Sequence, residues 1–310
     1  MKSDFNTLSF SEKERICESV FACNGPYWHL YTDGTRMQNI FCSVDDFRIG
    51  MWILAASLHM HKNVKALTFE LMNNHVHLIL SGMKMDCIRV FDDFASRLKH
   101  VFARKGRVID WRYFEMNVIS IDDIQMLRNE IIYVNRNAYV ANPMYTPNSY
   151  PWGGGCFYFN CWVKYLNPTP LGKLKVNTQR ELLHTRDVSL FPELLEIDSI
   201  PFAPSFCDIE LGESMFRDAR SYFGLLTRNA EAFSQIASRL KDMVFLTDDE
   251  LYSVLCSFIN KEYSVKTSAQ LTGQQKIDTA RYLRFNCNAT NQQLRRLLRM
   301  EMSILEELFP

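Results

Sequence analysis

The chain has 310 residues, of which 47% are hydrophobic and 13% aromatic, a composition that excludes an intrinsically disordered protein. Its length favours two domains, or one domain with a substantial extension. The 35 basic residues are balanced by 35 acidic ones, which argues mildly against a nucleic-acid partner as long as both signs are evenly spread.

The first half of the chain alternates predicted strands and helices. The strands are rich in aromatic and β-branched residues, and the helices repeat apolar residues every three or four positions. They follow in the order strand, helix, strand, strand, helix, strand, helix, at residues 26–32, 44–59, 64–70, 71–80, 88–103, 113–119 and 122–140, with Asp122 as the expected cap of the last helix. The turn residues Asn73-Asn74 separate the strand at 64–70 from the histidine segment of 71–80, so the two are expected to form a hairpin. This split βαβ pattern predicts an α+β fold in which an antiparallel sheet carries helices on one face.

The second half is expected to be a connection followed by helices. After Pro143, Pro147 and Pro151 end the regular structure, residues 156–215 have the prolines and acidic residues of a connecting segment. Residues 216–310 contain amphipathic helical patterns, and the last three, between residues 276 and 309, are compatible with a helix-turn-helix. We therefore divide the chain into 1–155, 156–215 and a mainly helical 216–310.

Two histidines, His75 and His77, lie in the strand predicted at 71–80. Side chains at i and i+2 leave the same face of a strand, so both imidazoles point together and can share a metal ion. The alternative is a hydrogen-bonded polar pair at a strand edge. A second pair, His59 and His61, ends a predicted helix, where i and i+2 do not face each other, and is expected at the surface.

Tyr133 and Asn137 lie four residues apart on the helix predicted at 122–140, so they project from the same face, about 6 Å apart. If that face packs over the histidine strand, Asn137 supplies an amide oxygen as a third metal ligand, and Tyr133 stands beside the metal. Tyr139 competes with Tyr133, but it is only two residues from Asn137 and projects elsewhere on the helix.

Two imidazoles and an amide oxygen form an open, neutral site that suits a hard divalent cation, Mg²⁺ or Mn²⁺, and leaves positions for phosphate oxygens. A tyrosine, whose unperturbed pKa is about 10, is a poor nucleophile until its proton is removed or its phenolate is stabilised. Against a metal-held phosphodiester it becomes useful, because it forms a covalent phosphotyrosine that stores the bond energy for rejoining.

The motifs Asn74-His75-Val76-His77-Leu78 and Tyr133-Val134-Asn135-Arg136-Asn137 are followed by Tyr150-Pro151-Trp152-Gly153. With these motifs, residues 26–154 resemble the IS200-like transposases, in particular the REP-associated tyrosine transposases of the HUH nuclease superfamily. The family has a Tyr-x-x-x-Asn pattern and then a Tyr-Pro-Trp-like segment. This chain departs from the family at Ala138, where a proline is usual, and at Asp33-Gly34, where Arg-Gly is expected.

The resemblance implies a ferredoxin-like catalytic domain that cuts single-stranded DNA next to an imperfect hairpin, forms a 5′-phosphotyrosine, leaves a free 3′-hydroxyl and can rejoin strands. It assigns Tyr133 as the nucleophile, and His75, His77 and Asn137 as the metal ligands. It also implies a bacterial, nucleoid-associated protein that acts as a monomer or homodimer, with Tyr133 working in its own subunit or on its neighbour's site.

Positive charge is concentrated in two regions. Six basic residues lie between residues 97 and 112 with only Asp110 opposing them, and five arginines lie between residues 281 and 299 without an acidic residue. We expect phosphate contacts there, with Phe102, Trp111 and Tyr113 available for base stacking; a solvated surface is the alternative. The predicted DNA-binding residues are Arg97, Lys99, Arg104, Lys105, Arg107, Arg112, Arg295 and Arg296, and for the last two a packing role is an equal alternative.

Two other functions stay open. One is a catalytically silent DNA-binding regulator that keeps the fold. The other is a metal hydrolase of small phosphoesters, for which the sequence offers no carboxylate cluster suited to two metal ions.

The sequence features that bear on membranes and on cysteine oxidation both favour the cytoplasm. No apolar run reaches membrane-spanning length and the start lacks the apolar core of a signal peptide, so we expect a soluble cytoplasmic protein without a membrane partner. The nine cysteines are scattered and include no Cys-x-x-Cys, so we expect reduced thiols rather than a disulfide framework or a zinc ribbon.

Overall fold

The computed structural model describes residues 8–34, 37–141, 146, 148–227, 236, 246, 248–287 and 289–309, with side chains except at 138–141 and 248–250. The chain divides into two compact units. The first comprises Met1–Tyr139 and Tyr145–Leu226, and the second comprises Val140–Met144 and Thr227–Pro310. Each unit is described by itself below.

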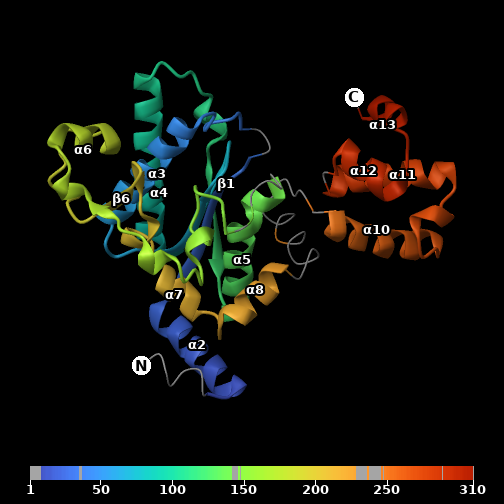
Figure 1. The fold of residues 1–310 in the computed structure, drawn as a ribbon, viewed down its shortest axis with the longest axis horizontal. Helices are drawn as coiled ribbons and strands as arrows, with labels where there is room; N and C mark the ends of the chain where they lie inside the picture. The colour runs from blue at the N-terminus through green and yellow to red at the C-terminus, as the bar shows by residue number, and fades with distance from the viewer. Residues whose placement is uncertain are drawn as a thin grey trace. The chain divides into compact units, whose positions relative to one another are not determined.

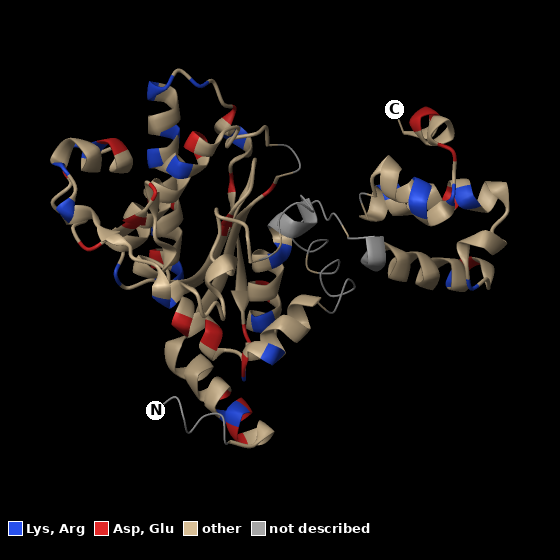
Figure 2. Cartoon of the chain, viewed as in Figure 1, with Lys and Arg blue, Asp and Glu red and all other residues tan. Residues whose placement is uncertain are grey.

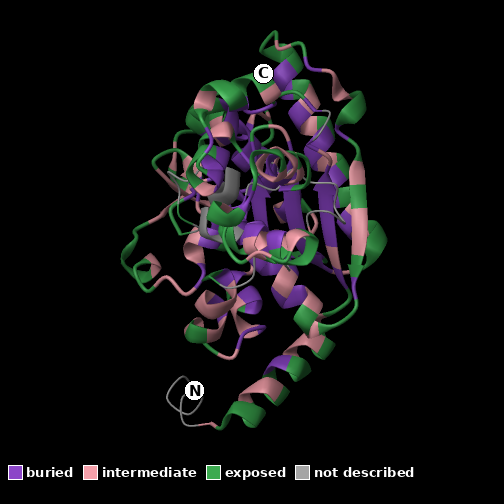
Figure 3. Cartoon of the chain, turned by 90° about the vertical axis from the view of Figure 1, so that its right-hand side faces the viewer, coloured by how far each residue is buried: buried purple, intermediate pink, exposed green. Residues whose placement is uncertain are grey.

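A four-stranded antiparallel sheet forms the centre of the first unit (Figure 1). Its strands are β1 (Tyr27–Thr32), β2 (Lys65–Leu71), β3 (Val76–Ser81) and β4 (Met116–Ile121), in the spatial order β2-β3-β1-β4. The two inner strands, β1 and β3, are buried along almost their whole length (Figure 3). The predicted α+β fold with an antiparallel sheet is confirmed, and the histidine strand is an inner one.

Helices α3 (Val44–Met60) and α4 (Lys84–Arg104) pack on one face of the sheet, and α5 (Ile124–Ala141) lies on the other face (Figure 1). The prediction that the helices share one face is therefore correct for α3 and α4 and wrong for α5. Residues alternate between the two faces of a strand, so Leu30 and Leu78 point toward α3 and α4, whereas His29 and His77 point toward α5. His29 and His77 therefore meet a single helix.

Local capping explains where the helices begin. The side chain of Ser43 accepts a hydrogen bond from the Asp46 amide at the start of α3, and the Asp46 carboxylate accepts one from the Ser43 amide. At α5 the predicted cap was wrong: Asp123, not Asp122, accepts a hydrogen bond from the Met126 amide, at 2.7 Å. Asp122 instead accepts a hydrogen bond from the Ser120 hydroxyl, and the helix starts later than expected.

An N-terminal helix, α2 (Phe10–Asn24), was not predicted. Its Glu14 carboxylate forms ion pairs with Arg128 of α5 at 2.6 Å and with Arg217 at 3.0 Å. The Arg128 guanidinium also donates a hydrogen bond to the Met215 carbonyl at 2.6 Å. These ion pairs thus join α2 to α5 and to the segment around Arg217.

The segment predicted as a connection, 156–215, folds as part of the first unit. It contains β5 (Thr169–Pro170), α6 (Val176–Leu183), β6 (Leu195–Ile197), β7 (Ile200–Pro201) and α7 (Ile209–Ser214), with short 3-10 turns at Gly155–Phe157, Val163–Tyr165, Leu171–Lys173 and Ala203–Ser205. Leu171, Leu183, Phe191 and Leu194 are buried against Trp52 of α3. With α8 (Ala219–Thr227), the unit extends to Leu226, beyond the boundary expected near residue 216.

The Tyr-Pro-Trp-Gly segment extends the edge of the sheet next to β2. The Leu71 amide donates a hydrogen bond to the Trp152 carbonyl at 2.9 Å, and the Tyr150 hydroxyl donates one to the Leu71 carbonyl at 2.7 Å. Gly153 pairs with Glu70, and a side chain at Gly153 would press on the Phe69 carbonyl at 3.1 Å. Glycine at this position permits the close backbone approach, and the backbone groups at the edge of β2 gain hydrogen-bond partners.

The second unit is mainly helical, as predicted. Its elements are α10 (Asp248–Tyr263), the 3-10 turn Ser268–Gln270, α11 (Gly273–Cys287), α12 (Asn291–Leu298) and α13 (Met302–Leu308). Their buried leucines form its core, among them Leu255, Leu283 and Leu294. The Thr290 hydroxyl accepts a hydrogen bond from the Gln293 amide and so begins α12.

Two expectations about the whole chain can be compared with the structure. Among the described helices, none combines the length and apolarity that crossing a membrane requires. The nine cysteines, all of which lie in described positions, form no disulfide.

Candidate functional site

The site begins with two histidines on neighbouring strands. β1 and β3 pair with Tyr31 opposite His77, which places His29 and His77 on the same face of the sheet. His29 Nε2 lies 3.0 Å from His77 Nδ1, and both side chains are fully buried. The Tyr31 ring stacks on His77, with ring centroids 6.1 Å apart, and its centroid lies 5.4 Å from that of His29.

Helix α5 brings three functional side chains to this pair. Glu130, Tyr133 and Asn137 are spaced three and four residues apart and so share one face of the helix. A Glu130 carboxylate oxygen lies 2.8 Å from His29 Nδ1, and Asn137 Nδ2 lies 3.0 Å from His77 Nε2. The Tyr133 ring stands edge-on to His77 at 5.6 Å between centroids and lies 6.3 Å from His29. The predicted convergence of Tyr133, Asn137 and His77 within one chain is observed.

These contacts define one consistent set of proton positions. An ionised Glu130 only accepts hydrogen bonds, so His29 Nδ1–H donates to it, and His29 Nε2 then accepts from His77 Nδ1–H. His77 Nε2 is left as an acceptor and receives a hydrogen bond from the Asn137 amide. The buried carboxylate therefore fixes the tautomer of His77 through His29.

His75 joins the cluster from the turn before β3. Its ring is perpendicular to that of His77, with centroids 5.0 Å apart, and its Nδ1 lies 2.7 Å from Asn74 Oδ1. Asn74 Nδ2 in turn donates to the Gly34 carbonyl at 2.8 Å. A Cβ at Gly34 would lie 2.7 Å from His75 Nδ1, so the Asp33-Gly34 turn approaches the site in a way that only glycine allows.

The predicted ligands fit a divalent cation at the level of donor atoms. Both histidines use Nδ1 in hydrogen bonds to the protein, which makes both Nε2 atoms the electron-pair donors. Asn137 reaches His77 Nε2 and presents its amide oxygen once the amide turns over. Within the described part of the chain, no group of three or more His, Cys, Asp or Glu is arranged to hold a metal ion; this set has two histidines and an amide.

Helix α5 is held rigidly over the sheet by a residue inside the tyrosine motif. Asn135 accepts a hydrogen bond from the Thr68 hydroxyl of β2 at 2.5 Å and donates one to the Tyr222 hydroxyl of α8 at 3.0 Å. Burial raises the pKa of Tyr222 well above its usual value, so its hydroxyl stays protonated. These contacts fix the rotation of α5 and hence the direction of Tyr133 and Asn137.

The site is closed to solvent. Tyr133 is 1% exposed, His77 is fully buried, and His75 is 8% exposed. The phenol and the imidazoles are thus covered by protein.

The basic residues predicted on and after α4 have different surroundings. Arg97 pairs with Asp93 at 2.8 Å, and Lys99 lies over the Trp111 ring at 5.9 Å. Arg107 pairs with Asp46 at 2.8 Å and donates to the Ile40 carbonyl at 3.1 Å, so its guanidinium joins two segments of the fold.

Arg104 and Lys105 are exposed at the end of α4, whereas the exposed Arg112 pairs with Asp110 at 2.6 Å. The expectation that Phe102 stacks on bases was wrong, because its ring is fully buried.

Arg295 and Arg296 lie on α12 of the second unit, where both side chains are exposed. They belong to a different compact unit from the histidines. The competing Tyr139 has a side chain outside those that the structure describes.

Two residues of the cluster, His29 and Glu130, were missed by sequence reasoning. Glu130 precedes Tyr133 by three residues, so the same helical spacing that joined Tyr133 to Asn137 was a signal for it. His29 had a weaker signal, because its proximity to His77 depends on the register between β1 and β3.

Comparison of the chain with protein-family models, curated proteins and solved structures finds no match.

Proposed function

We propose that this protein is a metal-dependent single-stranded DNA endonuclease and strand transferase that acts at hairpin-forming DNA through a 5′-phosphotyrosine. The observation that carries the proposal is the contact of Tyr133 and Asn137, from one helix, with His77 on an inner strand. The proposed nucleophile, a tyrosine, and two proposed metal ligands, a histidine and an asparagine, thus lie in one pre-organised cluster.

In the proposed reaction, the Tyr133 oxygen attacks the phosphorus of a DNA phosphodiester and loses its proton. The bond to the 3′ oxygen breaks, and that oxygen takes up a proton to become a free 3′-hydroxyl. Attack of a 3′-hydroxyl on the phosphotyrosine reverses the exchange and joins strands, so no water or energy source is consumed. His75, His77 and Asn137 are the residues that would hold Mg²⁺ or Mn²⁺, which supplies charge stabilisation to the phosphoryl group when bound.

Glu130 and His29 have a positioning role in this proposal. They hold His77 in the tautomer with an electron pair at Nε2, because Glu130 accepts a hydrogen bond from His29 and His29 accepts one from His77. Both residues are buried behind His77, where they contact no substrate.

A specific observation favours a second candidate, a catalytically silent DNA-binding regulator. Tyr133 and His77 are closed to solvent, as expected for side chains that serve only the core. The two candidates differ in whether the cluster ever opens to DNA.

Covalent trapping separates the two. The protein is incubated with a hairpin oligonucleotide and Mn²⁺, with the label on either the 5′ or the 3′ end of the strand. The nuclease is expected to retain the 3′-labelled fragment in a denaturing gel and to release the 5′-labelled fragment with a free hydroxyl. Binding of both oligonucleotides without any adduct identifies the regulator, and cleavage of a small phosphodiester without an adduct identifies a hydrolase.

A further inference from the structure

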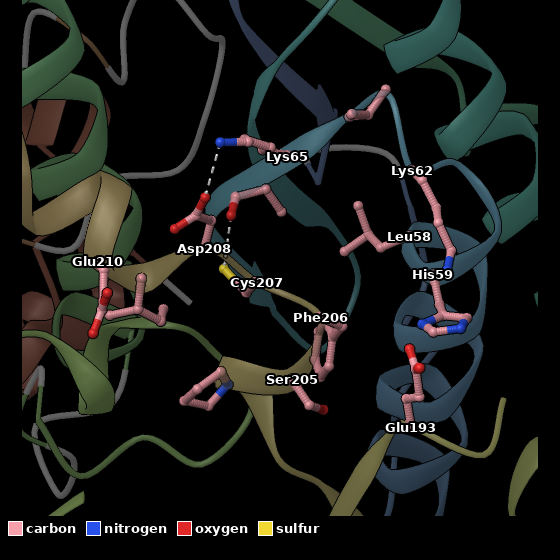
Figure 4. Close-up of a pocket in the computed structure, with 14 residues that line it drawn as sticks. Leu58, His59, Lys62, Lys65, Glu193, Ser205, Phe206, Cys207, Asp208 and Glu210 are labelled. Atoms are coloured by element: carbon pink, nitrogen blue, oxygen red, sulfur yellow. Dashed lines mark hydrogen bonds and ion pairs between the residues drawn. The ribbon is translucent and has the colours of Figure 1, made fainter. Parts of the chain in front are cut away.

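Outside the histidine cluster, one hollow of the first unit carries charges of both signs (Figure 4). It has a volume of ≈ 540 Å³ and lies between the end of α3, the start of β2 and the segment around Cys207. Lys65 pairs with Asp208 at 3.3 Å, and Figure 4 shows the Glu193 carboxylate pointing toward the His59 ring. Because its cations and carboxylates neutralise one another, this hollow selects no single ligand chemistry.

A second hollow, of ≈ 1090 Å³, is lined by nine residues, of which four are arginines and two are histidines, and is termed the basic groove below. It lies between the C-terminal half of α4 and α6 with the residues that follow α6. Its cationic and imidazole residues are Arg97, His100, Arg104, Arg180, His184 and Arg186. Glu181 is the single acidic residue among those that line it.

The helix periods explain why these side chains gather. Arg97, His100 and Arg104 are spaced three and four apart on α4, and Arg180 and His184 are four apart at α6, so each set forms one stripe. Leu98 and Phe102 are buried on another side of α4. His100 and Arg104 of the α4 stripe and Arg180 of the α6 stripe are exposed, and both stripes line the groove.

Apolar packing fixes α6, the helix of the second wall of the groove. Leu183 of α6 is buried in the cluster with Trp52 and Phe191, which anchors the helix to α3. The residues after α6 are held by Arg180, whose Nε donates to the Arg186 carbonyl at 3.2 Å. The arginines of this wall thus lie on a packed helix and on the segment bonded to it.

The charge of the groove is largely uncompensated. Arg104, Arg180 and Arg186 are exposed, and in the described residues none of the three forms an ion pair with a carboxylate. Burial, together with the charges of Lys105 and Arg104, lowers the pKa of His184, which reports positive potential at this point. Figure 2 shows basic residues along α4 and at α6.

We infer that the basic groove binds the phosphodiester backbone of single-stranded DNA outside the segment that is cut, an inference that rests on the proposed function. Guanidinium groups along two walls match a linear polyanion, because each can bind a phosphate with paired hydrogen bonds. Apart from its histidines the lining has no aromatic side chain on which bases stack, so the groove holds the strand independently of its sequence.

The test removes one arginine from each wall. The variant R104Q/R186Q keeps the backbone hydrogen bond of Arg180 and touches no residue of the histidine cluster. The control R15Q/R89Q removes two exposed charges from α2 and from the first half of α4. Affinity for a hairpin oligonucleotide with single-stranded flanks is measured by fluorescence anisotropy over a range of salt concentrations.

For R104Q/R186Q we expect about tenfold weaker binding. We also expect the slope of log Kd against log salt concentration to become shallower by about 1.4, because each lost phosphate contact on a single strand removes about 0.7. The control is expected to bind like the natural chain, and both variants should form adduct at the natural rate once DNA is saturating. Hydrogen exchange of the natural chain provides an independent measurement, with protection of α4 and α6 expected on binding.

The outcomes separate the groove from the proposed function. Unchanged affinity and salt dependence in R104Q/R186Q, or an equal loss of affinity in the control, would overturn the inference that the groove binds DNA. An adduct formed by the natural chain would still support the proposed function. If the natural chain forms no adduct with any oligonucleotide, the proposed function fails. The inference that the groove binds the strand that is cut then fails with it. Tighter binding of an RNA of the same sequence overturns the assignment to DNA.

Discussion

The histidine cluster and the basic groove lie on opposite sides of the same sheet and have opposite physical characters. The cluster is buried, and its members are joined by hydrogen bonds of 2.8–3.0 Å from Glu130 through His29 and His77 to Asn137. The groove is open: Arg97 pairs with Asp93, whereas Arg104, Arg180 and Arg186 are exposed. Short buried contacts suit chemistry that needs fixed geometry, whereas exposed cations suit screened attraction to a polyanion.

This difference predicts that chemistry and affinity are separable by mutation. Changes in the cluster are expected to abolish or slow adduct formation with little effect on Kd. Changes in the groove are expected to do the reverse. A variant that affected both to the same degree would show that the two regions form one binding surface.

The largest effect is expected for Tyr133→Phe. The substitution removes only the hydroxyl, so the buried ring still packs against His77 and the fold is retained. We expect no covalent adduct and a Kd for hairpin DNA within about twofold of the natural value, because the groove is untouched. A denaturing gel and anisotropy titration measure the two quantities.

Tyr139→Phe is the matched control for that experiment, since it removes the same atom from the neighbouring tyrosine of the same helix. We expect it to keep the adduct. Loss of the adduct in Tyr139→Phe, with its retention in Tyr133→Phe, would reverse the assignment of the nucleophile.

A somewhat smaller effect is expected for His77→Ala. The change removes a proposed metal ligand and leaves His29 and Asn137 without their shared partner. We expect the rate of adduct formation to fall by more than about 100-fold, and the free energy of unfolding to fall by about 1–3 kcal/mol. Chelation of divalent cations should reproduce the first effect in the natural chain without the second.

The other His-x-His pair provides the comparison. His59→Ala alters a half-buried residue at the end of α3, which contacts Phe191 rather than the cluster. Its adduct rate should stay within about twofold of the natural rate. An equal loss in both variants would mean that histidine removal acts through stability alone.

Glu130→Gln tests the positioning role and is expected to have a moderate effect. The amide keeps the size of the carboxylate but removes the charge that fixes His29. We expect the metal concentration for half-maximal adduct formation to rise about 10–100-fold, with a smaller change in the rate at saturating metal. Titration with Mn²⁺ measures both.

Glu14→Gln is the control, because it removes a carboxylate from an ion pair that also attaches to α5, through Arg128. It should lower stability and leave the metal dependence unchanged. Hydrogen bonding from Arg128 lowers the pKa of Glu14, so its contribution to stability is present above the ordinary carboxyl pKa and is lost as the pH falls through the lowered value. A shifted metal dependence in this variant would argue against a specific role of Glu130.

Periodicity predicted the parts of the fold that depend on local sequence. The four-residue spacing placed Tyr133 and Asn137 on one face, since this follows from helix geometry alone. The prediction that His75 shares a strand with His77 was wrong, because His75 lies in the turn before β3 and only His77 is in the strand. His29 requires the register of two strands that are far apart in the chain. The groove requires α6 to dock on Trp52, and a helix as short as Val176–Leu183 inside a segment rich in turns gives no signal of where it packs.

The smallest effect is expected in the second unit, for R295Q/R296Q. These arginines are exposed on α12, but α12 packs on α13, which follows the exposed Glu301 and carries the exposed Glu306 and Glu307. The nearby carboxylates offset the attraction of the arginines for phosphate, so we expect Kd to change less than about threefold and the salt dependence by less than about 0.7. A loss as large as that of R104Q/R186Q would place a second DNA contact on α12, and the cations of the groove would then be only part of the surface that holds the strand.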